Sequence, residues 1–399
     1  MVLGQGIGDE AGFFEGLVDD YEEFVFTFFP IITRRELLEA VRDMKASQET
    51  RAFVHATAAI TINMRVNQRR HCDYDIVRSQ VLFLVTRGLE IRGAIMPYQR
   101  PNVQTIMLST FIHVCLFAHH VNDDMAFFYL REAITNLQIL DVDGVAGAAN
   151  NNNDRPRLQR LYWLLFIHER FASLRFYRVP ILSPLSSLPV SDGTLEPGIE
   201  QWYTAIIQRF CMLDDTFIAN WIKKGNPSAP ECDAGTDWSW IEAKQAQLSA
   251  EMDLHAHPSP ILTEMQQVDI IITSYWVRTL LWQIALSVCL LTSDSSSDWM
   301  SLSFPLRLSH QLQSLLTLIS RDSIEVHGAG ILQKIFDITS TIADILIHVT
   351  PLTPRADTEA HIADFFFLYD YLNNMSKFFE AERKLLQEKR ERIRVIFSR

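Results

Sequence analysis

The sequence has few cysteines, and none of them lies close to another. Its five cysteines are Cys72, Cys115, Cys211, Cys232 and Cys289. The absence of a C-x-x-C pair excludes a cysteine zinc cluster on ligand number and spacing, so we expect no metal site. The odd number of thiols, together with an amino terminus that lacks a basic and then apolar run, predicts a reducing intracellular compartment.

The sequence also lacks an excess of positive charge. Its 36 lysines and arginines are outnumbered by 48 aspartates and glutamates, which gives a formal net charge of -12. No broad positive field is present to neutralise phosphates. We therefore expect no direct DNA binding by this chain.

No apolar run is long enough to predict a membrane span. The longest one, residues 275–291, is interrupted by Arg278 and Gln283, whereas a spanning helix needs about 20 mostly apolar residues. Gly-rich phosphate loops and the G-x-S-x-G and H-E-x-x-H motifs are missing as well, so we expect no cofactor. Nor does any segment show the strict alternation of a strand bounded by hairpin turns.

What the sequence does contain is helical periodicity. Apolar residues make up 48% of the 399 residues and recur at helical spacing. We predict a single all-α domain over residues 1–399, an irregular superhelical array of about a dozen helices with a large core. Surface loops are expected at residues 141–154, 183–197 and 224–237, which are rich in Gly, Asn, Ser and Pro. The last helix, residues 360–397, should change at Ser376 from an apolar half to a charged, solvated half, residues 376–399.

Two short polar stretches predict local structure. Thr33 and Glu36 have the spacing of a capping box, in which Thr33 accepts a backbone N–H and Glu36 reaches back to the N-cap amide. The stretch HHVNDD at residues 119–124 permits a metal site, because His and Asp four residues apart can share an ion on a helix. The alternative is that its polar residues cap the next helix, which accounts for them without a metal.

One helix organises the others. Residues 157–170, in a stretch that runs on through Arg175 until Pro180 stops the helix, carry apolar side chains at helical spacing, with Trp163 and Phe166 between them. The helix is therefore apolar around most of its circumference, and other helices must surround it. We expect Trp163 and Phe166 to be almost fully buried.

Residues 160–170 of that helix read RLYWLLFIHER and are followed by Arg175 and by Pro180-Ile-Leu182. This pattern resembles the signature of the fungal-specific transcription factor domain, the middle homology region of binuclear zinc cluster regulators. It is most similar to maltose- and amylolysis-type activators. Residues 129–134 (YLREAI), 276–283 (WVRTLLWQ) and 302–308 (LSFPLRL) are similar to the same group, in the same order. This sequence departs from the family in one respect. Those regulators carry a six-cysteine zinc cluster before this domain, whereas this sequence contains no such cluster.

The resemblance implies an α-helical superhelical fold and a regulatory role. We expect a stand-alone, nuclear regulatory domain that senses a small molecule or contacts a partner, either a full-length zinc cluster regulator or a second copy in a homodimer. The alternative is a cytoplasmic enzyme that performs cyclisation or proton transfer in a fungal secondary-metabolite pathway, without metal or nucleotide. The sequence assigns no catalytic residue, although His168, Glu169 and His113 are of the types that transfer protons.

The charged end of the central helix has two interpretations. Glu169 is spaced to pair with Arg170 or Arg175, which would make the group structural. Alternatively, Arg160 and His168 turn towards a cavity shared with the helix at residues 276–283 and bind a polar or anionic ligand, since arginine offers a planar fork of donors. The candidate ligand-binding residues are Arg160, Trp163, His168, His113, Trp276 and Trp282.

Overall fold

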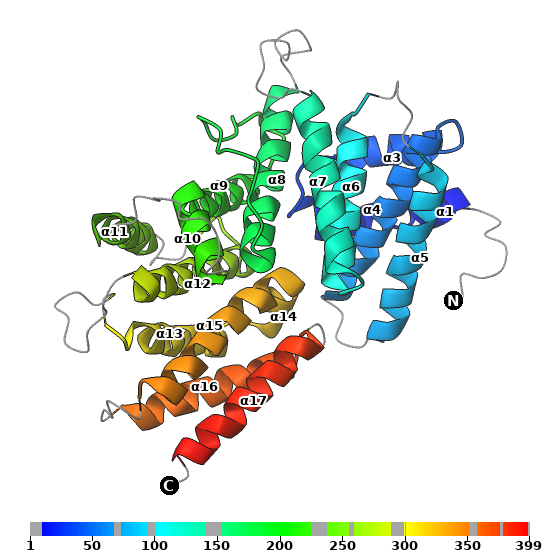
Figure 1. Ribbon diagram of the computed structural model, residues 1–399. Helices are drawn as coiled ribbons and strands as arrows, with labels where there is room; N and C mark the ends of the chain where they lie inside the picture. The colour runs from blue at the N-terminus through cyan, green and yellow to red at the C-terminus, as the bar shows by residue number, and fades with distance from the viewer. Residues whose placement is uncertain are drawn as a thin grey trace. The chain divides into compact units, whose positions relative to one another are not determined.

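The computed structural model describes residues 10–67, 73–94, 100–140, 154–225, 238–254, 259–288, 299, 301–350, 357–375 and 378–397. Every regular element in these ranges is a helix, from α1 to α17, and none is a strand (Figure 1). The predicted all-α class is confirmed. Within this part of the chain no helix combines the length and the apolar character needed to cross a membrane.

The chain divides into two compact units. Unit 1 comprises Met1–Ala172 and Ile181–Glu200, and unit 2 comprises Ser173–Pro180 and Gln201–Arg399. The division falls within two helices, α8 (Arg155–Phe176) and α9 (Pro197–Cys211). The single-domain organisation stays a prediction.

Unit 1 contains the helices from α1 to α7 and α8 as far as Ala172. The helices before α8 are α1 (Glu10–Glu15), α2 (Val18–Tyr21), the π-helical η1 (Glu22–Phe26), α3 (Arg34–Asp43), α4 (Gln48–Asn67), α5 (Tyr74–Arg92), α6 (Val103–Ala118) and α7 (Asp123–Leu140). Apolar residues recur at helical spacing over residues 9–26, which favours one continuous helix, but the structure contains three short elements there, α1, α2 and η1. A tight turn in which the Leu17 amide donates to the Phe14 carbonyl at 3.1 Å separates α1 from α2.

The predicted local caps are present. The Thr33 hydroxyl accepts from the Glu36 amide at 3.3 Å, and the Glu36 carboxylate accepts from the Thr33 amide at 2.8 Å, so the capping box is confirmed. At the start of α7 the Asn122 side chain accepts from the Met125 amide at 3.0 Å, as the capping interpretation of residues 119–124 requires. Each cap satisfies backbone donors that a helix start leaves unpaired.

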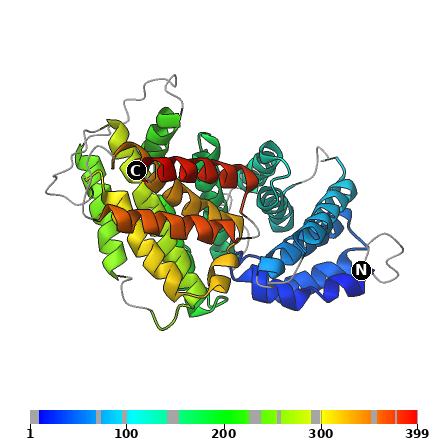
Figure 2. The ribbon, with the colours of Figure 1, turned by 90° about the horizontal axis from the view of Figure 1, so that it is seen from below.

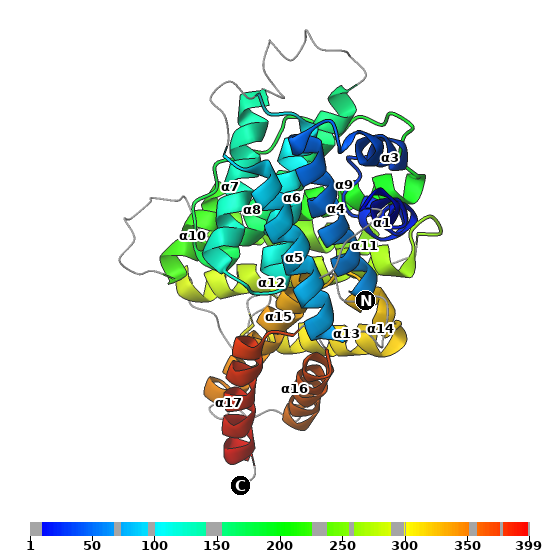
Figure 3. The ribbon, with the colours of Figure 1, turned by 90° about the vertical axis from the view of Figure 1, so that its right-hand side faces the viewer.

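Small residues let α4 and α5 lie side by side in unit 1 (Figure 3). A β-carbon at Gly88 would come within 3.2 Å of the Ala52 carbonyl oxygen, so the glycine permits the close approach. On the other side of α4 lies α6, most of whose side chains are buried. α8 completes this core: Trp163 is 2% exposed and Phe166 is 1% exposed, which confirms that both are buried.

Unit 2 is built around one apolar helix. Its helices after α9 are α10 (Asp215–Gly225), α11 (Trp238–Leu254), α12 (Glu264–Val288), α13 (Phe304–Leu318), α14 (Arg321–Glu325), α15 (Ala329–His348), α16 (Thr358–Asn373) and α17 (Glu380–Phe397). α15 contacts α12, α13, α16 and α17, and most of its 20 residues are buried. A helix that is apolar around its circumference must be surrounded.

The sequence predicted one helix over residues 360–397, whereas the structure contains two, α16 and α17 (Figure 2). Helix α16 ends at Asn373, and Met375, Phe378 and Phe379 are then buried in the connection. A straight continuation would have taken these apolar side chains and those of α17 away from the core. Instead α17 packs against α15 and buries Leu386 and Ile393.

The predicted loops are described only in part. Residues 183–196 contain no helix. Lys224 and Gly225 belong to α10, so the structure corrects the beginning of the third loop. Residues 141–153 and 226–237 lie outside the described residues.

Candidate functional site

The polar side chains of α8 hold an irregular segment along the helix. We call residues 181–194 the strap. In the described part of the chain, no hydrogen bond joins the strap backbone to the backbone of another segment. Side chains of α8 bind the strap backbone instead. The pairs are Glu169 with the Ile181 and Leu182 amides at 2.9 and 2.8 Å, Tyr162 with the Ser183 carbonyl at 2.7 Å, Trp163 with the Ser187 carbonyl at 3.3 Å, and Gln159 with the Val190 amide at 3.2 Å. The strap therefore runs antiparallel to α8.

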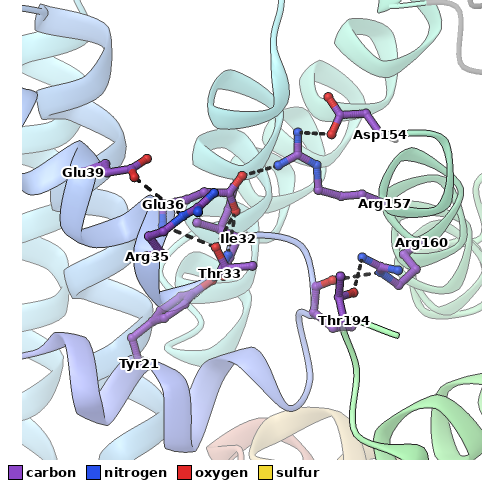
Figure 4. A network of polar contacts seen from close by, with 11 residues as sticks. Tyr21, Ile32, Thr33, Arg35, Glu36, Glu39, Asp154, Arg157, Arg160 and Thr194 are labelled. Carbon is purple, nitrogen blue, oxygen red and sulfur yellow. Dashed lines mark hydrogen bonds and ion pairs between the residues drawn. The ribbon is translucent and has the colours of Figure 1, made fainter. Parts of the chain in front are cut away.

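Arg160 is part of the same arrangement. Its guanidinium is buried and donates to the Pro30 carbonyl at 3.1 Å, to the Asp192 carboxylate at 2.8 Å and to the Thr194 hydroxyl at 3.3 Å. Figure 4 shows Arg160 directed at Thr194, with Arg157 reaching Glu36 nearby. Burial opposes ionisation of Asp192, but hydrogen bonds from Thr194 and Arg160 lower the pKa of its carboxyl. These contacts give Arg160 a structural role in unit 1.

Glu169 is fully buried, and residues distant in the sequence bind it. Arg131 of α7 donates to its carboxylate at 2.7 Å, in addition to the two strap amides. Burial raises the pKa of Glu169, while those amides, Arg131 and Arg170 act to lower it. Arg175, which the sequence offered as a partner on the same helix, pairs instead with Glu382 of α17 at 2.5 Å within unit 2. A buried carboxylate needs such partners, because ionised groups are costly in an apolar interior.

His113 and His168 lie next to each other in unit 1. Their ring centroids are 5.4 Å apart at an interplanar angle of 80°, and the His113 Nδ1 lies 2.8 Å from the Ala126 carbonyl. Burial lowers the pKa of His113 to about 4, and burial together with His113 lowers the pKa of His168 to about 3. Both rings are therefore neutral at neutral pH. Such low pKa values do not suit a general base near pH 7.

The two candidate tryptophans belong to unit 2. Trp282 donates its indole N–H to the Ser301 carbonyl at 3.1 Å, and Trp276 donates to the Asp337 carboxylate at 2.8 Å. Both are almost fully buried. The six candidate residues thus divide between the units, with four in unit 1 and two in unit 2. Their role in ligand binding stays a prediction.

The contact of Trp276 leads to a polar cluster that the sequence did not predict. Asp337 on α15 accepts from Trp276 and, at 2.8 Å, from the Gln333 side chain, which accepts from Arg175 at 2.7 Å. Burial raises the pKa of Asp337 to about 6, although hydrogen bonds from Trp276 and Gln333 and the charge of Arg175 oppose the rise. We call Arg175, Trp276, Gln333, Asp337 and Glu382 the Asp337 cluster.

Tyr177, at the end of α8, lies close enough to Asp337 for the carboxylate to influence it. Burial and Asp337 both raise the pKa of the Tyr177 hydroxyl. The Arg178 amide donates to the Ser173 carbonyl at 3.2 Å, the bond that closes a Schellman motif. Tyr177 occupies the left-handed position of this motif at φ 52°, where glycine or asparagine is usual.

The unusual backbone at Tyr177 places its ring on Trp221 of α10. The two rings are parallel within 5°, with centroids 6.4 Å apart. A β-carbon at Gly225 would lie 2.0 Å from the Tyr177 ring, so only glycine leaves room for it. The Lys224 ammonium lies 4.3 Å from the centroid of the Trp221 ring, a cation–π distance. Desolvation lowers the pKa of Lys224, although Asp337 and Asp344 oppose the shift.

Helix α15 therefore presents a polar row beside its apolar residues, separate from the buried Lys334, which pairs with Asp269 at 3.2 Å. Gln333, Asp337, Ser340, Thr341 and Asp344 follow helical spacing. Thr341 accepts from Gln283, which in turn accepts from Lys224. Further along, Lys389 of α17 pairs with Asp344 at 2.7 Å. Titratable groups with shifted pKa values thus gather with aromatic rings in unit 2, which is the pattern of a functional site.

The sequence signal for this cluster was weak. Trp276 was selected, but Asp337 and Gln333 stand in a largely apolar segment without a motif. Tyr177 lies near the end of the predicted central helix, and Lys224 is the first residue of a predicted surface loop. A carboxylate and an amide four residues apart on an apolar helix were the available signal. In the described part of the chain, no group of three or more His, Cys, Asp or Glu side chains is arranged to hold a metal ion.

Two curated fungal proteins are similar to this chain. A probable sucrose utilization protein of Candida albicans is 23% identical over 340 residues, which cover 82% of this chain and 63% of that protein. A respiratory transcription factor of Saccharomyces cerevisiae is 22% identical over 223 residues, which cover 55% of this chain and 43% of that protein. The chain thus aligns with less than two thirds of either relative. No model of a known protein family matches it.

Proposed function

We propose that this chain is the regulatory part of a fungal transcription regulator, and that it senses a small molecule or contacts a partner regulator in the nucleus. The observation that carries the proposal is the similarity over 82% of the chain to the sucrose utilization protein, together with that to the respiratory transcription factor. The stretch on α8 that resembles the fungal-specific transcription factor domain also supports it, and in the structure Trp163 and Glu169 of that stretch hold the strap.

These 399 residues do not contact DNA specifically in this proposal. Their net charge of -12 repels phosphates, and DNA binding draws most of its affinity from phosphate neutralisation. Access to a promoter would come from a full-length zinc cluster regulator as the partner. A second copy of the chain, in a homodimer, is the alternative partner.

A tethered reporter tests the regulatory role. The chain is fused to a bacterial DNA-binding domain in a yeast that carries the matching reporter gene. We expect the output to change with carbon source, because one relative is named for sucrose utilization. The same fusion with Phe166→Ala, which disrupts the core, is the control, and its output should no longer respond to carbon source. An output equal to that of the bacterial domain alone under every carbon source would overturn the proposal.

The purified chain without the fusion partner provides the second measurement. A gel-shift assay should detect no sequence-specific duplex. Tight, salt-sensitive binding to one sequence would contradict the indirect role at DNA, since salt dependence reports phosphate contacts.

The second candidate function is an enzyme for cyclisation or proton transfer. The observation that favours it is Asp337, because a pKa of about 6 suits a group that gives and takes a proton near neutrality. Native mass spectrometry of protein purified from its source separates the two functions. A sensor releases its bound molecule unchanged after incubation. An enzyme converts the molecule, and Asp337→Asn abolishes the conversion.

A further inference from the structure

We propose that the surface formed by Tyr177, Lys224 and Asp337 in unit 2 binds a small zwitterion that carries an ammonium group, an acid group and an apolar side chain, such as an α-amino acid. The site deepens the sensing role under the proposed function, and rests on it for the consequence of binding. Binding itself is measured on the purified chain and does not depend on the reporter.

Among the charged side chains beside α15 that the structure describes, the Asp337 carboxylate and the Lys224 ammonium form no ion pair. Glu382 pairs with Arg175 at 2.5 Å, and Asp344 pairs with Lys389 at 2.7 Å. Among the described residues no cation lies within ion-pair distance of Asp337, which accepts hydrogen bonds from the neutral Trp276 and Gln333 side chains.

Lys224 is the ammonium group that corresponds to the Asp337 carboxylate. Its ammonium donates to the neutral Gln283 side chain and forms no ion pair with the residues that the structure describes. Yet Asp337 is near enough to act on its charge. The Lys224 side chain is exposed, whereas Asp337 is part-buried, and a part-buried carboxylate without a counterion is costly. A ligand that brings an ammonium to Asp337 and a carboxylate to Lys224 gains two charge-assisted hydrogen bonds.

Tyr177 supplies the apolar surface of the site. Its side chain is 46% exposed even though its ring is stacked on Trp221. The chain keeps a non-glycine residue in the left-handed region to achieve this, and Gly225 provides the room. Backbone strain of this kind is commonest at functional sites. An exposed aromatic ring supported from behind can accept an apolar or aromatic side chain.

Together these groups select a zwitterion over its singly charged relatives. A simple amine would satisfy Asp337 but add a second cation beside Lys224. A simple carboxylic acid would satisfy Lys224 but add a second anion beside Asp337. Only a ligand with both charges completes the pairing, and discrimination of this type uses repulsion as well as attraction.

Calorimetric titration of the full chain with matched probes tests the proposal. The probes are phenylalanine and leucine, each with the amine and the acid that lack one of its charged groups: phenethylamine, 3-phenylpropanoate, isopentylamine and 4-methylpentanoate. We expect at least one amino acid to bind, and its amine and acid to bind about tenfold to a hundredfold more weakly, the effect of losing one charge-assisted hydrogen bond. Two results would overturn the proposal: no heat of binding with either amino acid at about 10 mM, or an amine or acid that binds as tightly as its parent amino acid.

Variants assign the binding to these residues. Asp337→Asn should weaken binding of the amino acid by about tenfold or more while affecting binding of the acid less, and Lys224→Gln should weaken binding of the amino acid equally while affecting binding of the amine less. Lys223→Gln on the same helix and Gly330→Ala on α15 are the controls, and both should bind as the unchanged chain does. Binding that survives Asp337→Asn and Lys224→Gln would place the ligand elsewhere. A reporter without response, combined with normal binding, would count against the proposed function alone.

Discussion

Replacing Asp337 with asparagine should stabilise the protein at neutral pH. The Asp337 carboxyl has its pKa raised from 3.8 to about 6, chiefly by burial. Its ionised form is therefore less stable in the folded chain than in the unfolded chain by about 3 kcal/mol. Asparagine has no such cost, but it loses the hydrogen bond from Gln333, which is worth about 1 kcal/mol. We expect a net gain of about 2 kcal/mol at pH 7.5.

The sign of the pH dependence follows from proton binding. Between about pH 4 and pH 6 the folded protein keeps the Asp337 proton while the unfolded chain has lost it, so the stability of the unchanged protein falls as pH rises through this window. Asparagine does not titrate. The advantage of Asp337→Asn should therefore shrink by about 2 kcal/mol from pH 7.5 to pH 4.5.

Urea denaturation followed by tryptophan fluorescence at both pH values measures this difference. Asp344→Asn is the matched control, because Asp344 lies on the same helix, is 54% exposed and is paired with Lys389. We expect it to stay within about 0.5 kcal/mol of the unchanged protein at both pH values. The reasoning about Asp337 would be refuted by an advantage of the same size at both pH values, or by destabilisation at pH 7.5.

Three further changes test the packing. Phe166→Ala should cost about 3–5 kcal/mol through the cavity it leaves, and an unchanged thermal midpoint would place α8 outside the core. Glu169→Gln should cost about 2–3 kcal/mol and accelerate hydrogen exchange at the Ile181 amide, since it weakens the attachment of the strap and leaves Arg131 without its carboxylate; unaltered exchange would mean that the strap is held by other contacts. Gly225→Ala should lower the free energy of unfolding by about 1 kcal/mol, because the added carbon displaces the Tyr177 ring. The control Gly330→Ala has nothing within 4 Å of the added carbon, and it should raise the free energy of unfolding by up to about 1 kcal/mol. Equal effects of the two changes in thermal denaturation would show that the ring does not need Gly225.

The sequence by itself determined the features that depend on neighbouring residues. Helical spacing of apolar residues gave the all-α class and the burial of Trp163 and Phe166. The Thr33 and Glu36 pair located a helix start to the residue. These features are legible because helix periodicity and capping act within one or two turns, so the residues that decide them lie within a few positions of each other.

Helix interruptions were decided by the packing of the unit. The residues after Asn373 have helical composition, yet the chain breaks there so that Phe378, Phe379 and α17 return to the core. Helix propensity summed along the chain does not include the free energy of burying those side chains, because that free energy depends on helices far away in the sequence.

The partners of buried charges were decided by the tertiary structure alone. Glu169 was expected to find its cation on its own helix, whereas Arg131 lies 38 residues away, and Arg175 pairs with Glu382, 207 residues away. The pKa of Asp337 has the same origin, since burial by other helices is its main cause. Desolvation depends on all atoms around a group, whatever their position in the chain, and only the folded structure brings those atoms together.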